Sequence, residues 1–141
     1  MSFTIVKVRG YSVGGLVVPG IEPGSGRLGD DLLDFTLERL RARGVGDVTV
    51  VYVSNPEVGW TALAGYRCDD VASLAVGDSM IRITDKYAAR FTPDGSRTDP
   101  WEDVWTQVEI AEKDGEIARA YREEVAFLPA SGEMELFVSL E

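Results

Sequence analysis

Alternating apolar and polar residues divide the first half of the chain into short extended segments around one amphipathic stretch. The β-branched run FTIVKVRG (residues 3–10) predicts a strand, and VGGLVVP (13–19) predicts a second extended segment. After a Gly- and Pro-rich loop, leucines recur at helical spacing in LLDFTLERLRAR (32–43), which predicts a helix capped by Asp30 or Asp31. The runs VTVVYVS (48–54) and GWTALAGYRC (59–68) predict two strands joined by a hairpin-like connection.

The second half of the chain repeats these signals. A strand is expected over residues 80–91, followed by a helix over 100–112 whose apolar residues recur at i, i+3, i+4 and i+7. The stretch EIARAYREE (116–124) predicts a second short helix. Strands are then expected over residues 125–129 and 133–140.

The order strand, helix, strand, strand therefore occurs twice, at an offset of about 70 residues. We predict one α+β domain over residues 1–141, with half 1 at about 1–70 and half 2 at about 78–141. The halves are expected to be related by pseudo-two-fold symmetry and to form antiparallel sheets with their helices on one face. In the last strand the apolar set expected under the helices is Met134, Leu136, Val138 and Leu140.

Composition narrows the function classes. The chain has 141 residues, a net charge of −10, one cysteine and no histidine. The negative charge disfavours nucleic acid and membrane surfaces as partners. Without histidine, a Ser-His-Asp triad and the usual imidazole-rich zinc sites are excluded, and we expect no metal and no cofactor. The N-terminus lacks the features of a signal peptide, so the expected location is cytoplasmic.

Five strings carry a further signal: GWTALAGYRC, IRITDKYAARFTPDG, WEDVWTQV, EEVAF and EMELFVSL. Together with the duplicated order of elements, they resemble the gyrase-inhibitor-like family, also called the AraC-type effector-binding domain. The resemblance covers essentially the whole chain. The chain departs from the family pattern at Ala126, the position matched to an aromatic residue that follows the acidic one.

The resemblance implies a crevice between the two halves, lined by aromatic rings, with a buried carboxylate that pairs with cationic or polarised aromatic ligands. Glu124 is the first choice for that carboxylate, and the adjacent Glu123 competes with it. The predicted function is a stand-alone small-molecule-binding domain that takes hydrophobic aromatic or cationic compounds, for drug sensing or sequestration. Because no helix-turn-helix segment is found, any DNA reading would need a separate regulator as partner.

The candidate ligand-binding residues are mostly aromatic. In residues 59–68, small side chains between two large rings leave room for something flat, whereas the other aromatic candidates also suit a core. Glu135 is equally compatible with an exposed strand face. The full set is Trp60, Tyr66, Tyr87, Phe91, Trp101, Trp105, Glu124, Glu135 and Phe137.

Three other functions stay open at this stage. The first is a hydrolase of electrophilic drug-like compounds, in which Glu124 and Tyr66 would orient water and polarise the leaving group. No catalytic residue is assigned, and an enzyme is less favoured than a binding protein. The second is a protein-interaction module that inhibits DNA gyrase, and the third is a scaffold without a ligand.

Overall fold

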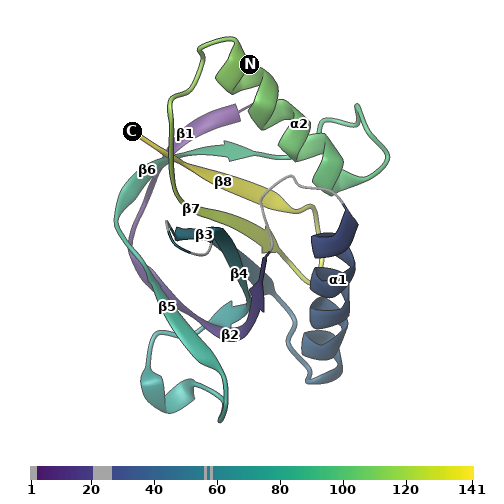
Figure 1. The fold of residues 1–141 in the computed structure, drawn as a ribbon, viewed down its shortest axis with the longest axis vertical. Coiled ribbons are helices and arrows are strands. Elements are labelled where there is room, and N and C mark those ends of the chain that lie inside the picture. Colours follow the sequence, from purple (N-terminus) through teal and green to yellow (C-terminus); the bar gives the residue numbers. More distant parts are fainter. Residues whose placement is uncertain (1–2, 21–26, 56, 58) are drawn as a thin grey trace.

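The computed structural model describes residues 3–20, 27–55, 57 and 59–141, which form one curved antiparallel sheet with two α-helices (Figure 1). The helices are α1 (Arg27–Ala42) and α2 (Pro100–Lys113), and a short 3-10 turn covers Val71–Ser73. The eight strands are β1 (Phe3–Val8), β2 (Tyr11–Pro19), β3 (Val48–Asn55), β4 (Gly59–Arg67), β5 (Ser79–Ile83), β6 (Lys86–Phe91), β7 (Arg119–Leu128) and β8 (Glu135–Leu140).

Both helices have recognisable end signals. The Asp99 side chain accepts a hydrogen bond from the Trp101 backbone N–H at 3.0 Å, and Pro100 occupies the first turn of α2. α1 begins at Arg27, which is earlier than the predicted caps. The prediction starts the helix later because the glycine in this first turn is typical of a loop. Gly44, with φ 86°, lies just beyond the end of α1 and adopts the left-handed conformation that terminates helices.

The strand order confirms the predicted duplicated α+β fold. The sheet runs β1-β6-β8-β7-β3-β4-β2-β5, and the neighbouring strands are antiparallel. One unit is β2, α1, β3 and β4, and the other is β6, α2, β7 and β8, with β3 and β7 paired at the centre. Both helices pack on the same face of the sheet, where their apolar residues join one core.

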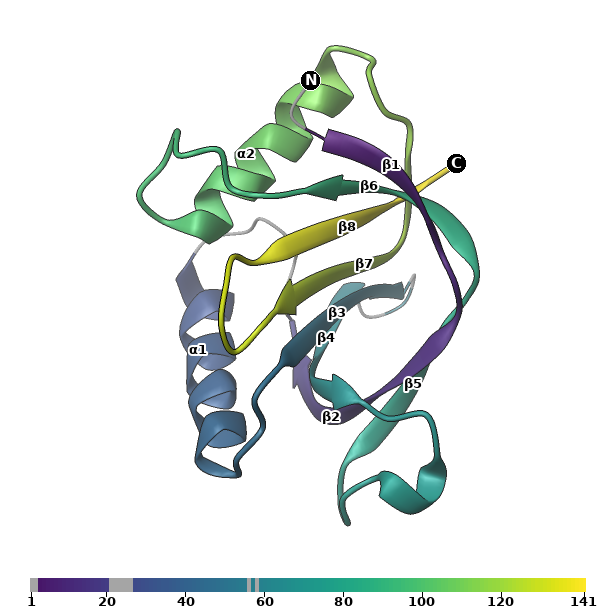
Figure 2. The same cartoon turned by 180° about the vertical axis from the view of Figure 1, so that it is seen from behind.

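One long two-stranded ribbon connects the two ends of the sheet. β1 leads into β2 and β5 into β6, and β1 pairs with β6 while β2 pairs with β5 in the same antiparallel register. The ribbon bends where the Gly10 N–H donates to the Asp85 carboxylate. A Cβ at Gly10 would lie 2.9 Å from the Ile83 carbonyl oxygen, so a side chain there would force the bend to shift. Figures 1 and 2 show the ribbon arching round the side away from the helices.

This curvature buries both faces of the sheet. On the helix face, three leucines of α1 and the apolar side of α2 cover the strands. The four residues of the last strand that were predicted to lie there do so: Met134, Leu136, Val138 and Leu140. The opposite face, which we call the ribbon face, carries a second and smaller cluster beneath the bend, formed by Val13, Val51, Leu63, Ile83 and Val125.

The second short helix predicted over residues 116–124 is wrong. β7 begins at Arg119, which pairs with Leu140 of β8, and runs on to Leu128. The register shifts between Arg119 and Glu124, and Tyr121 takes a φ of 54°. The local sequence of residues 116–124 is compatible with a helix or a strand. The segment forms a strand because it pairs with β8 on one side and β3 on the other. The single strand predicted over 80–91 is likewise divided at the bend into β5 and β6.

Strands β2 and β4 approach closely at Gly65. A Cβ there would lie 1.8 Å from the Gly14 carbonyl oxygen, a distance that two non-bonded atoms cannot occupy. We expect Gly65→Ala to lower the free energy of unfolding by ~1–3 kcal/mol or more, measured by urea denaturation. Gly46→Ala is the matched control, because its Cβ would meet Ala130 at an ordinary 3.8 Å. Equal losses in the two variants would contradict this account of the contact.

Candidate functional site

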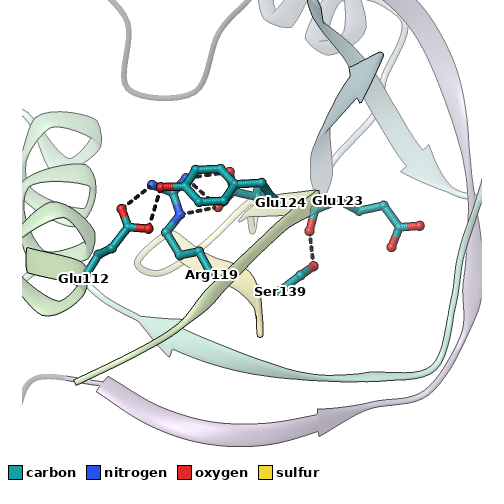
Figure 3. A network of polar contacts seen from close by, with 6 residues as sticks. Glu112, Arg119, Glu123, Glu124 and Ser139 are labelled. Atoms are coloured by element: carbon teal, nitrogen blue, oxygen red, sulfur yellow. Dashed lines mark hydrogen bonds and ion pairs between the residues drawn. The ribbon is translucent and has the colours of Figure 1, made fainter. Parts of the chain in front are cut away.

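Two adjacent glutamates of β7 point to opposite faces of the sheet. Glu124 extends toward the helix face and Glu123 toward the ribbon face (Figure 3), as side chains alternate along a strand. Glu124 is in register with Tyr52 and Val138, which both belong to the helix-side core. Glu123 is in register with Val53, which packs against the ribbon-side cluster. Each face therefore has a carboxylate among apolar side chains.

Glu124 is fully buried and holds the guanidinium of Arg119. Arg119 Nη2 lies 2.6 Å from Glu124 Oε1 and 2.8 Å from Oε2, and Arg119 Nε donates to Oε2 at 3.2 Å. Burial raises the pKa of the Glu124 carboxyl, and the hydrogen bonds from Arg119 offset part of that rise. Because a guanidinium stays charged at any ordinary pH, this carboxylate always faces a cation.

Two aromatic rings lie within cation–π distance of the same guanidinium. Its central carbon is 4.4 Å from the ring centroid of Tyr121 and 6.0 Å from that of Trp105. Glu112 of α2 lies 3.4 Å from Arg119 Nη1 (Figure 3). Glu112 also accepts a hydrogen bond from the Tyr121 hydroxyl. We call this group of five residues, Trp105, Glu112, Arg119, Tyr121 and Glu124, the Arg119 cage.

On the ribbon face, a small apolar pocket lies where the bend of the ribbon meets the central strands. We call it the bend pocket. Its volume is about 90 Å³, and its lining is Val8, Tyr11, Ile83, Lys86, Val125 and Phe137. The first four of these flank the bend, and the last two come from β7 and β8. The bend pocket is therefore built by strands of both halves.

A largely buried ion pair lies beside the bend pocket. Lys86 Nζ contacts Glu123 Oε2, and the two side chains are only 11% and 18% exposed. The Arg67 guanidinium lies 4.9 Å from the ring centroid of Tyr11, one of the lining residues. Burial raises the pKa of the Tyr11 hydroxyl, and the charge of Arg67 opposes that rise. The site thus combines apolar walls, a ring that accepts a cation, and a carboxylate neutralised by one amine.

A wider groove lies between the loop before α2 and the connection from β7 to β8. Its volume is about 710 Å³, and Trp101, Leu128 and Met134 supply its large apolar side chains. Arg41 and Arg97 line it together with three carboxylates, so its charges are mixed. One of these carboxylates, Asp103, is fully buried and already holds the loop, as described below. The groove has room for a ligand but concentrates no single charge.

Comparison with known proteins identifies the fold. No protein-family model matches the chain, and no curated protein matches it significantly. Among solved structures, an integron cassette protein from the mobile metagenome of Vibrio cholerae aligns with a TM-score of 0.77 at 15% identity, over 99% of this chain and 96% of that one. SAV2435, solved bound to tetraphenylphosphonium, aligns with a TM-score of 0.74 at 9% identity, over 100% and 94%. A putative transcription regulation protein from Staphylococcus aureus MU50 aligns with a TM-score of 0.68 at 9% identity, over 100% and 99%.

The chain shares the α+β fold of these three structures, which is the fold that the resemblance to the gyrase-inhibitor-like family implies. The fold inferred from the sequence resemblance is thereby confirmed over the full length of the chain. At identities of 15% and below, the likeness concerns the fold and assigns no ligand-binding residue.

Within this fold, the nine predicted site residues do not lie together in one site. Glu124 and Trp105 belong to the Arg119 cage, and Phe137 lines the bend pocket. Trp101 lines the groove. The remaining five line neither the bend pocket nor the groove and are outside the cage: Trp60, Tyr66, Tyr87, Phe91 and Glu135.

The space expected between Trp60 and Tyr66 on β4 is occupied by the protein itself. The two intervening alanines are fully buried in the helix-side core with the leucines of α1, and Trp60 packs against that core. The Tyr66 hydroxyl donates to Asp78 Oδ2 at 2.7 Å and accepts from a backbone N–H at 3.0 Å. Tyr66 and Glu124, the pair considered for hydrolysis, therefore belong to separate hydrogen-bond networks.

The other three candidates are dispersed. Phe91 is fully buried, with its ring centroid 5.2 Å from that of Phe3. Tyr87 is 59% exposed at the start of β6. Glu135 forms an ion pair with Arg90 at the side of β8. Each has an ordinary structural environment in this state of the protein.

Sequence reasoning missed the residues that complete both carboxylate sites. Tyr11 and Lys86 were not singled out, and Arg119 was assigned to a helix. The departure from the family pattern at Ala126 could have indicated which of the two glutamates has an aromatic residue on its own face of the strand. In a strand extended back to Arg119, Ala126 shares a face with Glu124, whereas the aromatic Phe127 shares the other face with Glu123.

Metal and membrane features were searched within the described part of the chain. Among those residues, no group of three or more Cys, Asp or Glu is placed to hold a metal ion. In the same ranges, no helix is long and apolar enough to cross a bilayer.

The carboxylate of Asp103 should make the free energy of unfolding depend on pH in the acidic range. Its carboxylate accepts from Gly95 N at 3.0 Å and from Gln107 Nε2 at 2.7 Å. Burial raises its pKa, but these hydrogen bonds outweigh burial and hold the pKa below its ordinary value of 3.8. The folded state therefore gains stability above pH 3.8 and loses it as the pH falls toward the folded pKa.

We expect Asp103→Asn to lower the free energy of unfolding by ~1–3 kcal/mol at pH 7. In urea denaturation series, the difference from the wild type should shrink as the pH falls below about 4 toward the lower folded pKa, because first the unfolded and then the folded Asp103 takes up a proton. Both proteins then bear a neutral side chain at this position. The exposed Asp34→Asn is the control. A difference that stays constant down to pH 2.5 would show that the charge of Asp103 is not the source.

Proposed function

We propose that this protein binds small hydrophobic cations in the bend pocket, with Glu123 as the counter-ion. The observation that carries the proposal is the burial of the Glu123 carboxylate beside an apolar pocket built by both halves. A carboxylate removed from water is costly unless a cation compensates it. A ligand that brings both positive charge and apolar surface would satisfy Glu123 and fill the pocket together.

Lys86 would be the group that the ligand replaces. Its ammonium contacts Glu123, and its residue lies directly after the bend. A lysine ammonium is strongly hydrated and sits on a flexible stem, so it can move to water when another cation takes the carboxylate. The net charge of −10 also favours the approach of cations over anions.

The walls of the bend pocket suit an aromatic cation. Tyr11 and Phe137 offer rings, and Tyr11 already has the Arg67 guanidinium over its face. Rings of this kind attract a cation by ~0.5–2 kcal/mol each. SAV2435, which shares the fold at 9% identity, was solved bound to tetraphenylphosphonium, a cation with this combination of charge and rings.

Binding requires the bend pocket to enlarge. A volume of about 90 Å³ is well below the roughly 300–1,000 Å³ of typical ligand pockets. Four lining residues flank the bend of the ribbon, so movement of the ribbon there and departure of Lys86 widen the same space. Affinity should consequently be reduced by the cost of opening.

The test is titration with tetraphenylphosphonium by isothermal calorimetry. We expect Glu123→Gln to weaken binding at least about tenfold, which corresponds to ~1.4 kcal/mol, because the counter-charge is lost. Glu109→Gln, which removes one exposed carboxylate from α2, is the matched control and should leave the affinity unchanged. Unchanged affinity in a folded Glu123→Gln protein would refute the proposed anchor.

A second variant tests the role of Lys86. Lys86→Met keeps the length of the side chain and removes its charge, so an external cation no longer competes with an internal one. We expect tetraphenylphosphonium to bind this variant several-fold more tightly than the wild type at pH 7. Weaker binding would mean that Lys86 supports the ligand rather than occupying its place.

A further inference from the structure

The groove beside the start of α2 is a preformed space with apolar side chains at its floor. Its volume of about 710 Å³ lies within the roughly 300–1,000 Å³ of typical ligand pockets, so no part of the fold has to open. Of its large apolar residues, Met134 is buried, and Trp101 and Leu128 are half-buried. Figure 2 shows α1, the loop before α2 and the turn between β7 and β8, which together supply the lining, on one side of the molecule.

The loop that forms one wall of the groove is held in place by carboxylates. Asp103 accepts hydrogen bonds from the backbone N–H groups of Asp94 and Gly95 at 3.2 and 3.0 Å. The Asp94 carboxylate accepts in turn from the backbone N–H of Ser96 at 2.9 Å. Two of the three acids that line the groove are therefore engaged in holding the loop, and Glu133 is the third.

The charged side chains that remain for a ligand lie at the rim of the groove. Arg41 and Glu133 are exposed, and within the described part of the chain their side chains form no hydrogen bond or ion pair. Arg97 lies 3.8 Å from Glu102, but both side chains are at least half exposed, so this pair contributes little. The groove thus offers a ligand two guanidiniums and one carboxylate.

Neither a simple anion nor a simple cation fits these charges well. An anion would meet Glu133 and the net charge of −10. Asp34 and Asp99 also line an adjoining hollow of about 180 Å³ that shares Trp101 with the groove. A cation would meet the two guanidiniums. A zwitterion avoids both penalties, because each of its charges finds an opposite charge and its net charge is zero.

We propose that the groove binds a small zwitterion with apolar or aromatic side groups, of about the size of a dipeptide. Its carboxylate binds Arg41 and Arg97, and its ammonium binds Glu133. Its side groups pack on Trp101 and Met134. Guanidiniums suit this role because they bind carboxylates through paired hydrogen bonds, and an indole ring suits an aromatic side group. The groove shares no lining residue with the bend pocket, so this site does not depend on the function proposed there.

The first experiment compares four forms of one probe, leucyl-phenylalanine, that differ only in their terminal charges. The free dipeptide is a zwitterion, its N-acetyl form an anion, its C-terminal amide a cation, and the doubly capped form neutral. Binding is followed by NMR through the indole N–H signals of the three tryptophans, with the signal of Trp101 assigned from Trp101→Phe. The free dipeptide should shift this signal and bind at least about tenfold more tightly than each capped form. The signals of Trp60 and Trp105 should not move.

Two variants at exposed positions test which charge each side chain binds. Arg41→Gln should weaken the binding of the free dipeptide and its N-acetyl form by several-fold without weakening that of the amide, because only the carboxylate loses a partner. Glu133→Gln should weaken the binding of the free dipeptide and the amide without weakening that of the N-acetyl form. Arg39→Gln, which removes an exposed charge from the same helix outside the groove, is the matched control for Arg41→Gln.

Equal affinity of the four forms, or an unmoved Trp101 signal, would refute the inference. Tightest binding of the N-acetyl form would make the groove an anion site, and tightest binding of the amide a cation site, and either result would overturn the proposed zwitterion. In Glu123→Gln, the free dipeptide should bind as it does to the wild type. Loss of dipeptide binding in that variant would place the dipeptide in the bend pocket instead.

Discussion

Burial of both faces of the sheet is the constraint on which the rest of this structure depends. The helices cover one face, and the bent ribbon covers part of the other. A strand at the centre of such a sheet sends successive side chains into two different apolar environments. β7 does so with two adjacent acids, and each would be costly to bury alone. Lys86 and Arg119, which come from different elements, supply the compensating charges.

The two internal ion pairs differ in how firmly they are held. Arg119 makes a planar bidentate contact with Glu124 and lies near two rings. Lys86 offers Glu123 a compact ammonium on a flexible stem. An apolar pocket adjoins the lysine pair, and an irregular backbone segment carries the arginine. Lys86 can therefore leave its carboxylate by side-chain movement alone, whereas Arg119 is held more firmly.

The shared fold has a physical basis that does not require shared residues. The aligned structures agree with this chain over nearly its whole length at 9–15% identity. Apolar alternation, two amphipathic helices and a glycine bend suffice to specify such a sheet, since many side chains satisfy each requirement. In the function proposed above, ligand chemistry would depend instead on a few positions near the bend and along β7, where the sequence is free to differ.

Local periodicity determined much of this protein in advance. The helix over residues 100–112, most strands, the duplicated order and the buried side of β8 could be predicted, because each depends on neighbours within a few positions. The start of β7 and the faces of Glu123 and Glu124 depend on register with β3 and β8, which the local pattern does not contain. Only the tertiary structure brings Tyr11 and Lys86 to Val125 and Phe137, because the bend of the ribbon carries them across the sheet.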